Sequence, residues 1–238
     1  MITVKQKNRS FNVTENPFWA KYHYWEPFTW PIFEKYIDKD HSYIDIGAWI
    51  GTTVLYGAQI AKHSYAIEPD TEAFVELKEN IELNPELENK ITTYQGCIND
   101  KQGTVKLHAH PEKKWNSSLS SLVYYANSRV SKLVPSQTLE SFVDLFKIQD
   151  FNFIKIDTEG AERLIIPSSK EFLKKYKPTL HLSLHPNTFT EESHVEGILD
   201  TLEIYKNIYN RDNTKLTIES LRRLLGEVQL ADIIATDR

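Results

Sequence analysis

Short apolar runs alternate with longer segments of helical spacing along most of the chain. The apolar runs predict strands at residues 43–47, 64–68, 91–95, 151–157, 179–185, 206–209 and 228–235. Apolar residues three or four positions apart predict helices at residues 52–62, 138–147, 169–176, 191–205 and 218–225, and another from the N-cap Asp70 to Asn84-Pro85. This alternation indicates an α/β fold with a mostly parallel sheet and helices on both faces.

Aromatic side chains are concentrated near the start of the chain, in residues 16–36. The spacing of apolar residues within 30–36 predicts a helix that packs on the sheet, and a lid over a ligand pocket is the alternative. We therefore expect a single domain, in which an aromatic-rich segment or lid at residues 1–40 precedes a main body at residues 41–238.

The alternation is also interrupted in the middle of the chain. Residues 104–109 predict a hairpin strand added to the main pattern, and the polar residues 110–134 predict a long irregular loop. Long irregular loops are uncommon inside compact domains and are often functional. We therefore expect this loop to shape a binding pocket.

Composition narrows the class of protein. The 238 residues are 40% hydrophobic and 26% charged, which excludes global disorder, and a net charge of −5 gives no sign of a nucleic-acid-binding surface. The most apolar run, residues 46–61, is too short to span a membrane, and residues 1–18 lack the apolar core of a signal peptide. A single cysteine, Cys97, excludes an intrachain disulfide and fits a reducing compartment. We expect a cytoplasmic protein with a small-molecule partner, in an oligomeric state that the sequence leaves open.

The first predicted strand ends in a glycine-containing turn with an acid on each side. Gly47 and Gly51 allow a close backbone approach to a ligand, but their spacing is not the Gly-x-Gly-x-x-Gly of dinucleotide sites. Asp45 would repel a pyrophosphate and suits a ligand with positive charge. Glu68 ends the next strand, about 20 residues after Gly47, where an acid accepts hydrogen bonds from ribose hydroxyls. S-adenosylmethionine combines a ribose with positive charge and has no phosphate.

A second motif, Phe-Ile-Lys-Ile-Asp-Thr-Glu-Gly-Ala-Glu at residues 153–162, narrows the family. Together with residues 43–51 and the segments 209–212 and 229–234, it makes the chain resemble the FkbM family of S-adenosylmethionine-dependent methyltransferases over about residues 22–236. The resemblance implies the Rossmann-like class I methyltransferase fold, with a seven-stranded sheet whose last strand is antiparallel. It also implies O-methylation of a hydroxyl on a small metabolite, polyketide or sugar.

The resemblance and the first turn together give a set of cofactor-binding candidates. Trp49 stands where many class I methyltransferases have the middle glycine of the turn, and residues 96–98 stand where the resembled enzymes hold the adenine by backbone contacts. The predicted cofactor-binding residues are Asp45, Gly47, Trp49, Gly51, Glu68, Cys97 and Ile98.

The second motif also carries the candidate catalytic groups. Lys155 lies on a strand that is expected to be buried on both faces, so it needs a carboxylate neighbour, for which Asp157 and Asp45 are candidates. Asp157 and Glu159 lie at the ligand edge of the sheet, and His185 ends the next strand. A histidine there accepts a hydroxyl proton near neutral pH.

We predict Asp157, Glu159 and His185 as catalytic residues. Clustered carboxylates also permit a divalent cation, and the sequence leaves this point open. Glu162 follows in the same motif. The alternative for Glu159 and Glu162 is that both are charges favoured by a helix N-terminus, and the alternative for Asp157 is a purely structural pairing with Lys155.

Two other functions compete with methyl transfer. An NAD-dependent oxidoreductase would share the acid at Glu68 but lacks its glycine motif. A non-catalytic cofactor-binding domain would keep the first turn but leaves the charged residues 155–162 unexplained.

Overall fold

The computed structural model describes residues 1–110, 116, 118–123 and 130–238. Within this part of the chain, the central sheet has eight strands in the order β12-β11-β13-β10-β9-β3-β4-β5. Their bounds are Ser42–Ile46 (β3), His63–Glu68 (β4), Ile91–Gln95 (β5), Phe151–Asp157 (β9), Thr179–Leu184 (β10), Asn207–Asn210 (β11), Lys215–Leu216 (β12) and Ala231–Thr236 (β13). β10, β9, β3, β4 and β5 are parallel neighbours, and β13 is antiparallel to both β10 and β11. The seven predicted strands are present, and the two-residue β12 makes the eighth.

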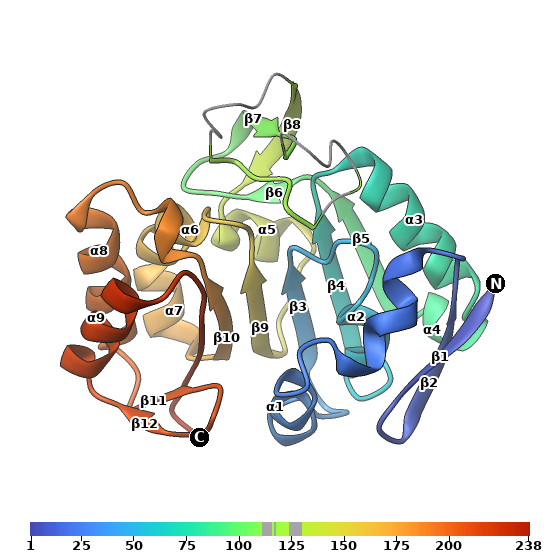
Figure 1. Ribbon diagram of the computed structural model, residues 1–238, viewed down its shortest axis with the longest axis horizontal. Coiled ribbons are helices and arrows are strands. Elements are labelled where there is room, and N and C mark those ends of the chain that lie inside the picture. The colour runs from blue at the N-terminus through green and yellow to red at the C-terminus, as the bar shows by residue number, and fades with distance from the viewer. Residues whose placement is uncertain (111–115, 117, 124–129) are drawn as a thin grey trace.

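Helices cover both faces of this sheet (Figure 1). They are α1 (Thr29–Tyr36), α2 (Val54–Gly57), α3 (Thr71–Glu82), α4 (Pro85–Glu88), α5 (Leu139–Leu145), α6 (Glu162–Ser168), α7 (Lys170–Tyr176), α8 (Glu192–Leu202) and α9 (Ile218–Glu227), with 3-10 turns η1 (Pro17–Tyr24) and η2 (Pro186–Thr188). α5 to α9 bury apolar residues against one face, which includes Ile44 and Ile156. η1, α1, α2 and α3 cover the other face, which includes Tyr43 and Phe153.

The predicted helix at residues 52–62 is mostly wrong, because only the four residues of α2 are α-helical. Thr52 and Thr53 are β-branched, and Gly57 lowers helix propensity further. Gly57 also lies so close to the Tyr43 ring that a Cβ atom would be 2.7 Å from Tyr43 Cε1. Tertiary packing therefore determines the backbone here.

The N-terminal residues form a β-hairpin that the hydrophobic pattern does not predict. β1 (Ile2–Gln6) pairs with β2 (Arg9–Val13), and Phe11 and Val13 are buried. Hydrogen bonds tie the hairpin and the residue after it to α3 and to the N-cap of α4: Thr14 N donates to Asn80 Oδ1, and Asn12 N donates to Asn84 Oδ1, both at 2.8 Å. The helix predicted at residues 30–36 is confirmed as α1, and its Trp30 is completely buried.

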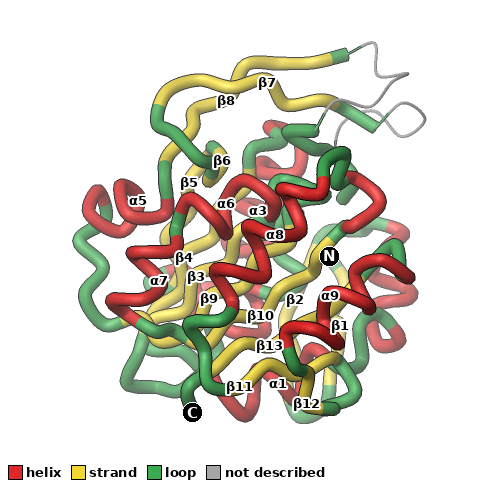
Figure 2. Tube along the Cα trace, turned by 90° about the vertical axis from the view of Figure 1, so that its left-hand side faces the viewer, coloured by secondary structure: helices red, strands yellow, loops and turns green. Residues whose placement is uncertain are grey.

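A small second sheet, of order β6-β8-β7, lies beyond the carboxyl end of β5 (Figures 1 and 2). β6 is Cys97–Ile98, β7 is Gly103–His108 and β8 is Ser131–Gln137. β7 confirms the predicted strand at 104–109, but its partner β8 begins inside the predicted loop 110–134. The prediction of an irregular segment there is therefore wrong for residues 131–134. Residues 111–115, 117 and 124–129 of that loop lie outside the described residues.

None of the helices in the described ranges has the length and apolar character needed to cross a membrane.

Candidate active site

A cavity lies at the edge of the sheet formed by the carboxyl ends of the parallel strands. Its space measures about 990 Å³, including the part open to solvent. Eight of the predicted residues line it: Gly47, Trp49, Glu68, Cys97, Ile98, Asp157, Glu159 and His185. The strand order β5-β4-β3-β9-β10 arranges them in a row that extends roughly 20 Å along the edge, since neighbouring strands lie about 4.8 Å apart.

The turn after β3 approaches the end of β9 at Gly47. Gly47 has φ +88°, and a Cβ atom at this position would lie 1.8 Å from the carbonyl oxygen of Asp157. Only glycine therefore allows the two backbones to meet here. Trp49 also has a left-handed backbone, with φ +47°, and its indole Nε1 has no hydrogen-bond partner in the part of the chain that the structure describes.

Glu68 presents a buried carboxylate to the cavity from the end of β4. Its Oε2 accepts a hydrogen bond from Trp49 N at 2.9 Å, and its Oε1 accepts one from Asp70 N at 2.7 Å. Burial raises the pKa of Glu68 to about 8. The carboxylate is therefore held in one orientation, and each oxygen keeps a second lone pair for a ligand.

Two predicted cofactor residues do not line the cavity as the structure describes it. Asp45 is completely buried under the turn, where its Oδ2 accepts a hydrogen bond from Thr53 Oγ1 at 2.6 Å. It pairs with Lys155 in the register of β3 and β9. Gly51 has φ +97° and lies against Leu55 and Leu77. Both residues support the turn from beneath.

The wall on the β5 side of the cavity is mostly apolar. Ile67, Ile98, Leu107 and Leu122 contribute to it, so the small sheet and the described part of the predicted loop do shape the pocket. Cys97 lies in the same wall, where burial raises the pKa of its thiol to about 11. A thiol with this pKa is a poor nucleophile at neutral pH, and Cys97 acts as a wall residue.

Lys155 and Asp157 form a buried ion pair on β9, with 3.0 Å between Lys155 Nζ and Asp157 Oδ2. Of the two carboxylates that the sequence offers as partner, Asp157 makes the contact. Burial alone would raise the pKa of Asp157, but the Lys155 ammonium outweighs it and keeps the pKa below its ordinary value. Burial alone would likewise lower the pKa of Lys155, and the carboxylates of Asp157 and Asp45 raise it instead.

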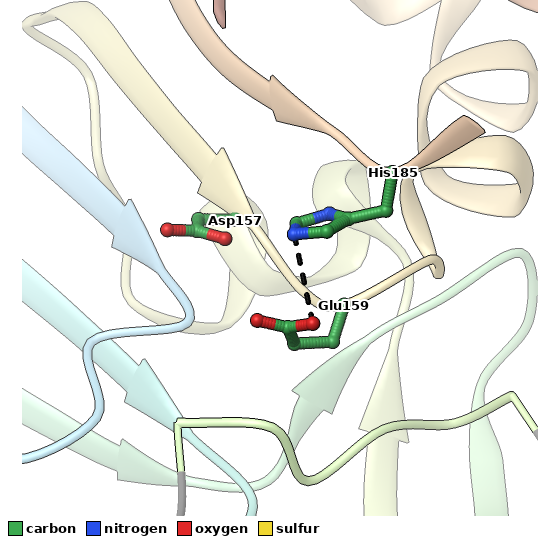
Figure 3. A group of neighbouring side chains, drawn as sticks. All are labelled: Asp157, Glu159 and His185. Atoms are coloured by element: carbon green, nitrogen blue, oxygen red, sulfur yellow. Dashed lines mark ion pairs between the residues drawn. The ribbon is translucent and has the colours of Figure 1, made fainter. Parts of the chain in front are cut away.

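His185 follows β10 and points toward Asp157 and Glu159 (Figure 3). Its Nε2 lies 3.6 Å from Glu159 Oε2, and its Nδ1 lies 3.4 Å from Glu162 Oε1. Burial would lower the pKa of His185, but the carboxylates of Glu162, Asp157 and Glu159 outweigh it and raise the pKa to about 9. With this pKa the ring holds its proton at neutral pH, which disfavours the predicted role as a free proton acceptor. Burial raises the pKa of Glu159 to about 7.

The aromatic N-terminal segment contributes residues that the sequence did not single out. Trp25 and Glu26 line the cavity, and Glu26 has φ +42°. Burial raises the pKa of Glu26 to about 8, and Thr29 Oγ1 donates a hydrogen bond to it at 3.0 Å. The local signal was weak, because Glu26 is one of two acids, with Glu34, in the aromatic-rich residues 16–36. Ser183, also in the wall, donates a hydrogen bond to Asp232 on β13 at 3.1 Å.

A Rossmann-like sheet with this acid-lined cavity at its carboxyl edge has the architecture of a class I methyltransferase. Comparison by sequence agrees, since the profile of the methyltransferase FkbM domain matches residues 45–211. The chain therefore belongs to the FkbM methyltransferase family. The NAD-dependent oxidoreductase alternative gives way to this assignment. A search among curated proteins gave no match.

Solved structures share the fold. The crystal structure of an FkbM methyltransferase from Methylobacillus flagellatus KT is 17% identical, with a TM-score of 0.52, and the alignment covers 84% of this chain and 44% of that one. The chain thus spans less than half the length of that protein. The methyltransferase domain of METTL16 is 12% identical, with a TM-score of 0.50 and coverage of 96% and 73%.

Proposed function

We propose that this methyltransferase transfers the methyl group of S-adenosylmethionine to a hydroxyl oxygen of a small molecule. One observation carries the proposal: Asp157, Glu159 and His185 converge in the same cavity as Glu68, at the opposite end of the row. One end thus offers the carboxylates of Asp157 and Glu159 as acceptors for a hydroxyl proton, and the other end offers an acid for a ribose.

The residues of the cavity fit S-adenosylmethionine. Glu68 is oriented to accept hydrogen bonds from two ribose hydroxyls, and the apolar wall that includes Ile98 and Leu107 suits an adenine. The unpartnered indole N–H of Trp49 offers a donor to the carboxylate of the methionine part. Glu26 offers an acceptor to its ammonium group. The wall carries no phosphate-binding glycine motif.

When bound, S-adenosylmethionine supplies a methyl group on a sulfonium, and S-adenosylhomocysteine remains after transfer. The chain's own contribution is to hold the acceptor oxygen in line and to receive its proton. Asp157 and Glu159 follow β9 and His185 follows β10, and the closeness of the three side chains supports a role for them at the acceptor hydroxyl. The ion pair with Lys155 fixes the carboxylate of Asp157.

A small acceptor is supported by the size and charge of the site. The cavity has to hold both the cofactor and the acceptor, and the side chains of Trp25, Leu107 and Leu122 line it together with the strand ends, which favours a metabolite or a sugar residue. The acids Glu26, Asp157 and Glu159 would repel an anionic acceptor. A neutral, hydroxyl-rich acceptor suits these hydrogen-bond acceptors.

The test is methyl transfer from S-adenosylmethionine with a deuterated methyl group to a panel of sugars, polyols and phenols. We expect S-adenosylhomocysteine and a product with an O–CD₃ group, identified by mass spectrometry and NMR. Asp157→Asn should lower turnover about 10²–10⁴-fold with S-adenosylhomocysteine affinity retained, since general acid–base groups contribute that much. Asp200→Asn, an exposed site on α8, is the control. Methyl transfer to nitrogen or carbon would contradict the proposal.

A further inference from the structure

Asp157, Glu159 and His185 each bring one potential ligand atom to a common point, with all three atoms within 4.8 Å of one another (Figure 3). We propose that these side chains bind a divalent first-row transition cation, such as Mn²⁺ or Zn²⁺, next to the acceptor hydroxyl. The role of the cation in catalysis rests on the proposed function, but its binding does not.

The donor set and its distances suit such a cation. Imidazole favours transition metals, carboxylates favour harder ions, and one imidazole with two carboxylates suits a cation between these extremes. Ligands at about 2.0–2.2 Å from one ion lie about 3–4.3 Å apart. The 3.6 Å between His185 Nε2 and Glu159 Oε2 falls inside this range. The widest pair has to close by only about half an ångström.

Glu162 supplies the outer partner that a metal-binding histidine requires. Histidine ligands usually donate their second ring N–H to a carboxylate, which fixes the tautomer and the ring orientation. Nδ1 of His185 faces Glu162 Oε1 at 3.4 Å, so Nε2 is the nitrogen directed at Asp157 and Glu159. Glu162 is completely buried and has no direct role at the cavity wall. Glu162 is not one of the three proposed ligands, so its position is an additional observation.

The loop that carries Glu159 is held in a fixed and strained form. Glu159 has φ +53°, a left-handed conformation that is unfavourable for a non-glycine residue. Thr158 N and Gly160 N donate hydrogen bonds to the carboxylate of Glu162 at 2.7 and 2.9 Å. Ser121 Oγ donates another to Glu159 O at 2.5 Å. Such strain persists where a side chain has to be held in one place for function.

The neighbouring charges leave room for a cation. Lys155 contacts one oxygen of the Asp157 carboxylate, so the other oxygen remains for a second partner. Lys155 and the divalent ion would together balance the acids Asp157, Glu159 and Glu162. A bound cation also excludes the proton from Nε2 of His185, since imidazole binds metals in its neutral form.

In methyl transfer, a cation held by Asp157, Glu159 and His185 would lower the pKa of the acceptor hydroxyl, so that its proton passes more easily to a carboxylate of the site. The oxygen then forms the O–CH₃ bond with its lone pair, the S–CH₃ bond breaks, and that bond's electrons stay on sulfur. No oxidant or further reactant is needed.

The experiment is a titration of the full chain with Mn²⁺ alone, without cofactor or acceptor, followed by the EPR signal of free Mn²⁺. Wild type is expected to bind one ion per chain. Glu159→Gly removes a ligand and relieves the left-handed backbone, so thermal stability should be retained. Loss of a side chain that only hydrogen-bonds a metal ligand already weakens metal affinity about 10–100-fold. We therefore expect Glu159→Gly and His185→Asn, which each lose a ligand, to bind Mn²⁺ at least about 100-fold more weakly than wild type.

The matched control is Lys147→Gly, which relieves the same backbone conformation, φ +53°, at an exposed position after α5. Its Mn²⁺ affinity should equal that of wild type. The inference is overturned if wild type binds no Mn²⁺ at millimolar concentration, or if Glu159→Gly binds it as tightly as wild type. Full O-methylation activity in chelator-treated protein would overturn the catalytic role of the cation and leave the proposed function intact. Mn²⁺ binding without any O-methylation activity would overturn the proposed function and leave the cation site intact.

Discussion

Glu68 is expected to make cofactor binding depend on pH. Burial raises the pKa of Glu68 to about 8 in the free protein, whereas ribose hydroxyls donate to the ionised carboxylate and favour it. Binding below pH 8 should therefore release a proton from Glu68. The affinity for S-adenosylhomocysteine should rise with pH up to about 8 and then level off.

The magnitude follows from the pKa. A pH of 6.5 lies about 1.5 pH units below the pKa of Glu68. Each unit adds about 1.36 kcal/mol to the free energy of ionising the carboxyl, so ionisation at this pH costs about 2 kcal/mol. The dissociation constant at pH 6.5 should therefore be about 30-fold larger than its plateau above pH 9. The same pKa makes the folded protein less stable as pH rises from about 4.5 to 8, because the folded state alone keeps the proton in that window.

Calorimetry in buffers of different ionisation enthalpy measures both the affinity and the proton released. In Glu68→Gln, the roughly 30-fold part of the pH dependence between 6 and 8 that Glu68 contributes should be lost, and the affinity at pH 9 should fall by about 2–4 kcal/mol, the value of two charge-assisted hydrogen bonds that do not add fully. Glu26, whose pKa is also about 8, is present in both proteins, so its contribution cancels. Glu72→Gln at the start of α3 is the control. A pH dependence that is identical in wild type and Glu68→Gln would refute the reasoning.

Two further expectations concern the turn and the N-terminal segment. Gly47→Ala puts a Cβ atom 1.8 Å from Asp157 O, so urea denaturation should show a loss of more than about 2 kcal/mol in the free energy of unfolding. In the control Gly226→Ala, the new Cβ atom has no other atom within 4 Å, so this change should be neutral or stabilising. An unchanged denaturation midpoint for Gly47→Ala would count against the close approach. If residues 17–26 form a lid, S-adenosylhomocysteine should slow hydrogen exchange in η1 and leave α9 unchanged, and equal protection with and without ligand would leave only the packing role.

Much of the architecture was predictable because it follows from local patterns. The alternation of apolar strands and amphipathic helices implies parallel βα units, and neighbouring parallel strands bring their carboxyl ends to one edge. Glu68, Asp157 and His185 could therefore be placed in one site from sequence. The N-terminal hairpin and β8 were missed, because short strands with few apolar residues have little periodicity of their own.

The sequence by itself determined the order of the elements, the glycine turn at Gly47 and the chemistry available at each strand end. The tertiary structure decided which side chains reach the cavity: Asp45 is buried beneath the turn, and Glu26 enters from a distant segment. It also decided the protonation of His185, because the carboxylates around it come from another element. Desolvation and Coulomb interactions depend on distance and burial in space, which spacing along the chain does not contain.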